Sequence, residues 1–494
     1  MYIATYDIGT TAVKGVVLEK DGHMVAAADK NLTTYMKGEQ KEQDPEEWYQ
    51  AFCAVTKEMI AQIPCAEISG VIMSGQMQDL ILIDESGKNI GNAVLYSDGR
   101  AAEEAEALRK SMQEGELERR TGNHYDGSLS LPKLLWIQKH DPERFRKTKK
   151  ILISAKDYII YRLSKKAVGD VTACSTAGAM NLKDTSWDVA ILNAAGISIE
   201  LFPKLYYPEQ VVGYVTPKAA ACTGLSTGTK VYAGIGDAGA TTLASGISDV
   251  GEYNINLGTS GWVAAISKQV GEVDNGVFNL AAFQKNCYIN VVPFLNGANI
   301  HRWVSSIFSE EGDNKIDYAK AEDLAAHSVP GSNGVVCLPY LNGERFPVMD
   351  AQIKGSFLGI TPKTTKGDMI RSCLEGVAFS IRQGIARIGY EPKKISVIGG
   401  GGRVKLWNQI LADVLGQKVY AYKNAEYLPA FALASSVLME QGKISGYKEF
   451  TDLLQGKEYS VCYTPDKKRT IVYDELYKSY LRLYPIVRMY YHGE

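Results

Sequence analysis

The order of apolar and polar positions along this chain predicts short strands followed by helices, in two successive rounds. Residues 2–6, 13–18 and about 24–34 carry the apolar runs of strands, and we expect them to form an antiparallel meander. Apolar residues at helical spacing follow over 45–63, with Asp44 placed to cap that helix. Further strands are expected at 68–73, 81–84 and 93–96, and further helices at 101–119, 131–139 and 155–163.

The same plan begins again in the second half of the chain. Strands are expected at 231–235, 253–255, 263–266 and 395–398, and helices at 238–245, 370–388, 405–415 and 473–491. Strands that alternate with helices in this way are typical of an α/β fold, here with a mixed sheet in each of two lobes. We expect the lobes to span 1–246 and 247–494, and the final helix to pack back across the first lobe.

The composition is that of an ordinary globular protein. The 494 residues are too many for one core, and 22% charged with 45% hydrophobic residues is a usual balance. A net charge of −2 gives no reason to expect a nucleic acid or an anionic membrane as partner. Eight dispersed cysteines without a C-x-x-C pair favour free thiols in a reducing compartment. With no signal peptide and no apolar run of about 20 residues, we expect a cytoplasmic protein.

Two glycine turns about half a chain apart carry nearly the same residues. Segments 7–11 (DIGTT) and 256–260 (NLGTS) each lie between two apolar runs. Glycine lets backbone N–H groups approach an anion closely, and the hydroxyl groups add further donors for phosphate oxygens. One such turn is a weak signal because Gly-Thr hairpins are common. Two copies indicate a duplicated lobe with a nucleotide phosphate tail held between the turns.

Two aspartates stand where an open α/β sheet presents its ligands. Asp7 ends a buried strand beside the first turn, which suits Mg²⁺ held largely through water, although Asp also starts many turns by bonding its own backbone. Asp237 lies in 234–239 (GIGDAG), between a strand and a helix. It is either the N-cap of that helix or a base that takes a proton from a substrate hydroxyl. The glycines on both sides favour the second role.

Further polar and glycine-rich segments follow other strands. The run 399–402 (GGGG) precedes a helix and is a candidate nucleotide cradle, although about half of such runs are structural turns. Met77 and Gln78 follow one strand, and Asp98 and Arg100 follow the next, so that their polar groups are candidates for a hydroxyl-rich ligand. Taken alone, Arg100 is more simply explained as one half of a surface ion pair.

Several enzyme classes are excluded. No Walker A sequence occurs, so the phosphate site is not a P-loop. The six histidines show no H-x-x-x-H spacing, which argues against a metal hydrolase. No G-x-S-x-G follows a strand, which argues against a Ser-His-Asp hydrolase.

The chain resembles the FGGY carbohydrate kinases. Two stretches match the signatures of that family at each fixed position, namely 128–140 (SLSLPKLLWIQKH) and 355–360 (GSFLGI) continuing to 368–375 (DMIRSCLE). Segments 42–45, 98–100 and 338–345 look most like the xylulokinase branch. The resemblance implies two ribonuclease-H-like lobes of the actin and hexokinase superfold around a cleft. It also implies ATP and Mg²⁺ as cofactors and a small sugar as substrate, and it is compatible with a homodimer.

The resemblance also implies roles for single residues. Asp237 would be the catalytic base, and Asp7 would hold Mg²⁺. The first lobe would mainly bind sugar and the second mainly ATP. The residues expected at the phosphates are Thr10, Thr11, Gly258 and Thr259; those expected along the adenosine are Gly400, Gly401, Arg403 and Asn408; and those expected at the sugar are Met77, Gln78, Asp98 and Arg100.

Two departures from the xylulokinase pattern keep the acceptor open. Xylulokinases usually have His where this chain has Gln78, and Asn where it has Ala238. The implied reaction is transfer of phosphate from ATP to D-xylulose, giving D-xylulose 5-phosphate. A kinase for another ketose, a polyol or an aldonate is an alternative, because hydroxyl recognition is sensitive to lost polar groups. An ATP-gated regulatory protein on the same superfold is a further alternative.

Overall fold

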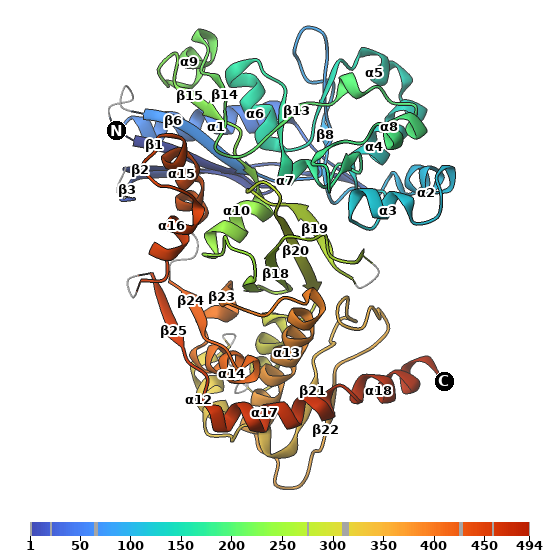
Figure 1. Cartoon of the computed structure of the whole chain (residues 1–494), viewed down its shortest axis with the longest axis vertical. Helices are drawn as coiled ribbons and strands as arrows, with labels where there is room; N and C mark the ends of the chain where they lie inside the picture. Colours follow the sequence, from blue (N-terminus) through green and yellow to red (C-terminus); the bar gives the residue numbers. More distant parts are fainter. Residues whose placement is uncertain are drawn as a thin grey trace.

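The protein has two lobes, each built on one mixed β-sheet with helices on its faces (Figure 1). The computed structural model describes residues 2–19, 22–63, 68–273, 276–308, 316–423, 428–456 and 459–493. In spatial order, the first sheet consists of β14 (Val211–Tyr214), β15 (Lys230–Tyr232), β6 (Ile68–Gly75), β1 (Tyr2–Ile8), β2 (Ala12–Glu19) and β3 (Met24–Asn31), with β16 (Ile235–Gly236) also paired to β6. The second consists of β19 (Phe278–Ala281), β20 (Tyr288–Phe294), β18 (Gly261–Ser267), β17 (Glu252–Leu257), β23 (Lys394–Ile398), β24 (Val419–Tyr422) and β25 (Ser460–Tyr463).

The two sheets repeat one topology. β1 pairs antiparallel with β2 and parallel with β6. In the same way β17 pairs antiparallel with β18 and parallel with β23. In each lobe the turn that leaves the central strand is one of the two Gly-Thr turns. The duplicated α/β lobe predicted from the twin turns is therefore confirmed.

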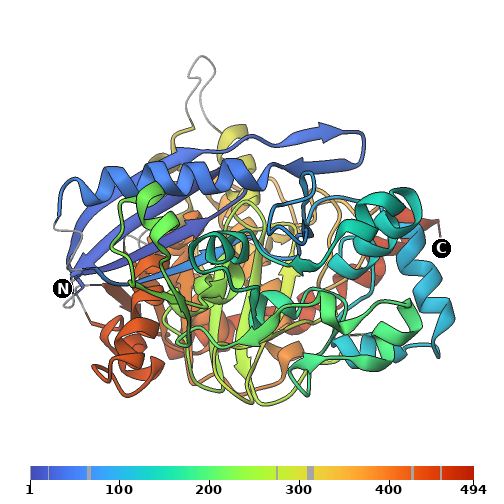
Figure 2. The same cartoon turned by 90° about the horizontal axis from the view of Figure 1, so that it is seen from above.

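Helices complete a core in each lobe. α1 (Pro45–Ile60) lies along the first sheet (Figure 2), with Trp48, Phe52 and Val55 buried and the Asp44 side chain accepting from the Glu46 N–H. In the second lobe, α13 (Lys366–Ile388) and α14 (Lys405–Leu415) pack together beneath the sheet. The predicted bounds of α14 agree with the structure.

One late helix returns to the first lobe. α15 (Leu428–Glu440) packs against β1, β6 and α10 (Asp237–Ala244) (Figure 1). At its end, Glu440 Oε1 lies 2.8 Å from Lys230 Nζ and Glu440 Oε2 accepts from the Tyr232 hydroxyl at 2.7 Å. The first sheet ends at Gly236 and the second begins at Glu252, so the predicted boundary falls between the sheets, although α15 crosses it.

The prediction that the final helix packs across the first lobe is wrong. α17 (Lys467–Tyr480) and α18 (Leu483–His492) lie on the second lobe (Figure 1). The Tyr473 hydroxyl donates to Glu375 Oε1 at 2.7 Å and accepts from Arg371 at 2.8 Å, all three side chains being buried. Tyr473 of α17 is thus held by a buried ion pair of α13, while the more apolar α15 covers the first sheet.

The remaining elements complete the two lobes around the sheets. The predicted helix over 101–119 is two helices, because Met112 is extended and Gly115 has φ +70°. No helix in the described ranges is long and apolar enough to cross a membrane. The other elements are β4 (Tyr35–Lys37), β5 (Gln40–Gln43), β7 (Ile81–Ile83), β8 (Ala93–Val94), α2 (Ala102–Ser111), α3 (Glu116–Thr121), α4 (Ser130–His140), α5 (Pro142–Lys147), β9 (Lys150–Leu152), α6 (Ala155–Ser164), β10 (Val168–Asp170), α7 (Val171–Cys174), β11 (Met180–Asn181), β12 (Ser186–Trp187), α8 (Val189–Ala195), η2 (Ile199–Leu201), β13 (Lys204–Tyr206), α9 (Pro217–Thr223), α11 (Ala298–Ile307), α12 (Tyr318–Ala326), η4 (Ser332–Gly334), β21 (Val336–Leu338), β22 (Ser356–Leu358), η5 (Gly400–Arg403) and α16 (Tyr447–Leu453).

Candidate active site

Hydrogen bonds hold both glycine turns in place, and the threonine at the tip of each turn is exposed. In the first turn, Gly9 N–H donates to the Ala12 carbonyl and Thr10 Oγ1 donates to Gln76 Oε1 at 2.8 Å. In the second, the Gly258 carbonyl accepts from the Ala298 N–H at 2.7 Å. Thr11 and Thr259 at the tips are exposed. Both turns therefore offer N–H and O–H donors without needing to rearrange.

Asp7 and Asp237 interact electrostatically at the end of the first sheet. Asp7 accepts from the Ser74 hydroxyl at 2.8 Å, and burial raises its pKa. Asp237 begins α10, where its Oδ1 accepts from the Ala238 N–H at 2.7 Å. Its pKa is raised to about 7, first because the surrounding protein reduces its hydration and second because Asp7 is negative. The residue is nevertheless exposed on its surface, so the carboxylate stays accessible to a ligand.

The predicted sugar residues Met77 and Gln78 lie next to the residue that precedes Asp237. A Cβ atom added at Gly236 would overlap Met77 Sδ, so Met77 packs directly against the glycine that precedes Asp237. Gln78 has φ +65°, a left-handed conformation that is uncommon for a residue with a side chain. Its carbonyl accepts from Lys133 Nζ at 2.8 Å, and its side-chain Nε2 donates to Ser128 Oγ at 2.7 Å. The structure thus brings Met77 and Asp237 to one corner.

Asp98 and Arg100 form an ion pair with two hydrogen bonds, near the Lys133 side chain that contacts Gln78. Asp98 is fully buried, and its two oxygens accept from Arg100 and from the Lys41 N–H, at distances between 2.6 and 3.0 Å. Arg100 also contacts Glu42 at 2.7 Å and lies 5.0 Å from the centre of the Trp136 ring. Because both oxygens of Asp98 are bonded, its visible role is to orient Arg100.

The glycine run 399–402 lies against the second turn. Gly399 has φ +89°, and a Cβ atom there would lie 2.7 Å from the Leu257 carbonyl carbon, one residue before Gly258. A Cβ atom at Gly400 would meet nothing within 4 Å. Asn408 Nδ2 donates to the Gly402 carbonyl at 2.7 Å, which leaves its buried Oδ1 without a partner. Arg403 is exposed and lines, with Gly400, a cavity of about 540 Å³. Gly401 is buried against Leu257 and Trp407.

Comparison with known proteins gives this arrangement a family. A family model described as the N-terminal domain of the FGGY family of carbohydrate kinases matches residues 2–244, and the corresponding C-terminal domain matches residues 253–429. The chain belongs to the FGGY family of carbohydrate kinases. The resemblance seen in the signature stretches is therefore confirmed.

Individual relatives of this FGGY kinase span its full length. A xylulose kinase from Staphylococcus xylosus is 29% identical over 490 residues, which cover 98% of this chain and 99% of that protein. A gluconokinase from Bacillus subtilis (strain 168) is also 29% identical, over 496 residues that cover 98% and 95%. The solved xylulose kinase from Rhodospirillum rubrum matches with a TM-score of 0.90 and 27% identity over the whole of both chains. This chain is thus a carbohydrate kinase, a class that uses ATP.

A buried ion cluster supports the Asp237 backbone of this FGGY kinase. Asp170 Oδ1 accepts from the Gly236 N–H at 3.1 Å and caps α7 through two further N–H groups. Asp170 Oδ2 lies 2.8 Å from Lys156 Nζ, which also lies 2.5 Å from Asp157. The side chains of Lys156, Asp157 and Asp170 are fully buried. No sequence pattern indicates this cluster, because Lys156 and Asp157 look like ordinary surface positions at a helix start.

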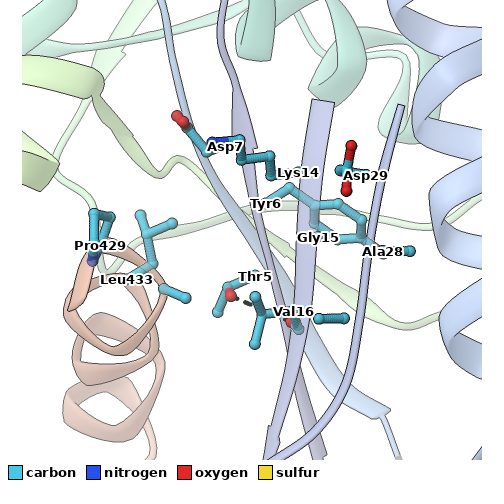
Figure 3. Close-up of a pocket in the computed structure, with 12 residues that line it drawn as sticks. Thr5, Tyr6, Asp7, Lys14, Gly15, Val16, Ala28, Asp29, Pro429 and Leu433 are labelled. Atoms are coloured by element: carbon cyan, nitrogen blue, oxygen red, sulfur yellow. Dashed lines mark hydrogen bonds between the residues drawn. The ribbon is translucent and has the colours of Figure 1, made fainter. Parts of the chain in front are cut away.

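The structure of this kinase shows three further candidate residues. Lys14 pairs in register with Asp7, and both line a cavity of about 530 Å³ beside Pro429 of α15 (Figure 3). A cation on the strand after a phosphate turn is a signal that a reader of the sequence could have used. On α11, Asn299 Oδ1 and His301 Nε2 are buried and have no hydrogen-bond partner among the described residues. The centre of the His301 ring lies 5.9 Å from that of the Trp407 ring of α14. No sequence pattern singles out these two.

The carboxylates fit a magnesium ion that is shared with a nucleotide. The described residues hold no group of three or more His, Cys, Asp or Glu side chains that would bind a metal alone. Mg²⁺ in kinases commonly takes only one or two carboxylates, with phosphate and water oxygens completing the octahedron. Asp7 uses one oxygen for Ser74, and its pKa is raised by burial, so a cation beside it would stabilise the ionised form. The residues present therefore suit Mg²⁺.

Proposed function

We propose that this FGGY kinase transfers the γ-phosphoryl group of ATP to D-xylulose and forms D-xylulose 5-phosphate. The observation that carries the proposal is the position of Asp237, an exposed carboxylate at the start of α10 beside Met77 and electrostatically coupled to Asp7. Relatives named as xylulose kinases support this acceptor, since they match nearly the whole chain.

In this proposal, Asp237 accepts the proton of the attacking sugar hydroxyl. The backbone N–H groups of Thr10, Thr11, Gly258 and Thr259, together with the hydroxyl groups of Thr11 and Thr259, bind phosphate oxygens from both sides, and Lys14 adds a positive charge beside Asp7. Asp7 would hold Mg²⁺, which would offset the charge of the transferring phosphoryl group. Water is kept from the γ-phosphate when the two lobes close.

The two lobes would then divide the substrates. The sugar binds mainly to the first lobe at Met77 and Gln78, with Arg100 oriented there by Asp98. The adenosine binds mainly to the second lobe along Gly400, Gly401, Arg403 and Asn408. Buried Asn408 Oδ1 has no partner among the residues that the structure describes, which supports a role as acceptor for a nucleotide donor group.

The compartment and assembly are also proposals. The seven described cysteines are free thiols, which suits the reducing cytoplasm. A homodimer is compatible with this fold, and size-exclusion chromatography with light scattering would test it.

A coupled ADP-release assay across ketoses, polyols and aldonates tests the acceptor. We expect D-xylulose to give the highest kcat/KM. A strong response to D-gluconate would instead favour the activity named for the Bacillus subtilis relative, which is about as similar. ATP hydrolysis that no acceptor stimulates would favour an ATP-gated protein and contradict the kinase proposal.

The pH dependence of the same assay reports on the base. Asp237 can accept a proton only when ionised, and its pKa of about 7 lies above the ordinary Asp value. Therefore kcat/KM for D-xylulose should fall as the pH drops below about 7. Bound Mg²⁺ should shift this fall to a lower pH, because its charge offsets that of Asp7. A profile measured between about pH 5 and 9 checks this. A flat acid side would contradict the assignment of Asp237.

A further inference from the structure

We propose that Gln78, held in one orientation by Ser128 and Lys133, makes this kinase select an uncharged polyhydroxy acceptor and reject an aldonate. This inference rests on the proposed kinase function and names the residues that select its acceptor. Three side chains, Asp126, Ser128 and Gln78, are linked by hydrogen bonds, and the donor of each bond follows from the chemistry of the groups.

The donors in this series of hydrogen bonds are identified starting from Asp126. Asp126 Oδ1 accepts from the Ser128 N–H at 2.7 Å and from the Ser128 hydroxyl at 2.5 Å. A carboxylate only accepts, so the single hydroxyl proton of Ser128 is directed to Asp126. The Ser128 oxygen must then accept from Gln78, 2.7 Å away, and the Gln78 atom that faces Ser128 must be Nε2.

This anchoring decides what Gln78 offers to a ligand. With Nε2 bonded to Ser128, the partly exposed Gln78 amide has Oε1 and one N–H left. A sugar hydroxyl both donates and accepts, so it matches this pair of groups. A carboxylate would accept from one N–H and be repelled by Oε1 and by the nearby charge of Asp126.

The backbone holds the same orientation. Gln78 keeps its left-handed φ of +65° while its carbonyl is bonded to the fully buried Lys133. Lys133 is fully buried and bonded to this carbonyl, and Arg100 already faces two carboxylates, Asp98 and Glu42. The charge of Arg100 is therefore balanced within the protein, so that it can donate to a sugar hydroxyl but gives no excess attraction for the carboxylate of an aldonate. A strained residue held this firmly next to a site is evidence for a role in that site.

The test compares kcat/KM for D-xylulose and for D-gluconate in the wild type, Gln78→Leu and Ser128→Ala. Ser86→Ala is the matched control, because Ser86 donates to Asp84 in the same Asp-x-Ser arrangement on the surface, at 2.8 Å. We expect the wild type to favour D-xylulose by at least about 100-fold. Ser128→Ala should lower that preference roughly tenfold through the KM for D-xylulose, since the amide is then free to turn. Gln78→Leu should lower it further, and Ser86→Ala should not change it.

The outcomes separate this inference from the proposed function. A Gln78→Leu or Ser128→Ala protein with the wild-type preference for D-xylulose overturns the inference and leaves the proposed D-xylulose kinase activity standing. A wild type that prefers D-gluconate overturns the inference together with the proposed acceptor, but leaves an FGGY kinase activity. A wild type that phosphorylates no acceptor overturns the proposed function, and the inference falls with it. Circular dichroism of each variant shows whether a lost preference comes from misfolding. In the folded variants, an unchanged kcat with MgATP shows that the substitution changed the orientation of the Gln78 amide and did not damage catalysis in general.

Discussion

Replacing Asp237 by Asn is expected to lower kcat for D-xylulose by roughly 10²–10⁴-fold, the usual contribution of a general base. The amide keeps the size of the side chain but cannot accept the hydroxyl proton. The affinity for ATP should stay nearly unchanged, since the residues proposed to bind the nucleotide lie on the two turns and the glycine run. Steady-state kinetics and calorimetric ATP binding measure both quantities.

The same variant should be more stable than the wild type at neutral and higher pH. The raised pKa of Asp237 means that the folded protein disfavours its charge, so stability present at low pH is lost as the pH rises through about 7. Because the side chain is exposed, we expect the melting temperature to rise by only a few degrees, roughly 2–4 °C. Asp317→Asn, at the exposed N-cap of α12, is the matched control, since Asn caps equally well. Full activity of Asp237→Asn would refute the base assignment.

Replacing Lys156 by Met is expected to destabilise the first lobe by about 3–5 kcal/mol, the usual cost of breaking a buried ion pair. Asp157 and Asp170 would be left fully buried without their cation. Burial already raises the pKa of Asp157, although the charge of Lys156 opposes this. The loss should appear as a lower midpoint of the first transition in urea.

The Lys156 prediction also concerns activity. Asp170 holds the Gly236 N–H, so its displacement should shift Asp237 and lower kcat more than it changes the KM for ATP. Lys478→Met removes an exposed ion pair of 2.7 Å with Glu475 and should change the stability by less than about 1 kcal/mol. If Lys156→Met behaves like Lys478→Met in both assays, the buried cluster has neither role.

Local patterns predicted the elements that carry the proposed catalytic residues. The apolar runs at 2–6 and 68–73 became β1 and β6, and the strand-glycine-helix order around Asp237 became β16 and α10. These segments are decided by nearby residues, so a pattern of neighbours is enough to find them. The same holds for the twin turns, whose sequences repeat because their lobes repeat.

Long-range partners could not be predicted in the same way. α15 is not among the predicted helices, and nothing in its own residues says that it packs on β1 and β6, more than 350 residues away along the chain. The final helix was placed on the wrong lobe because its tyrosines gave no sign of the Arg371–Glu375 pair that holds Tyr473. Likewise, the bond between Gln78 and Ser128 joins side chains 50 positions apart.

Phosphorus NMR of a reaction with ATP, Mg²⁺ and D-xylulose is the most direct test of the central claim. We predict one pentulose 5-phosphate for each ADP formed, with little inorganic phosphate, and loss of both products with Asp237→Asn. Formation of ADP and inorganic phosphate without a sugar phosphate would contradict phosphoryl transfer to D-xylulose.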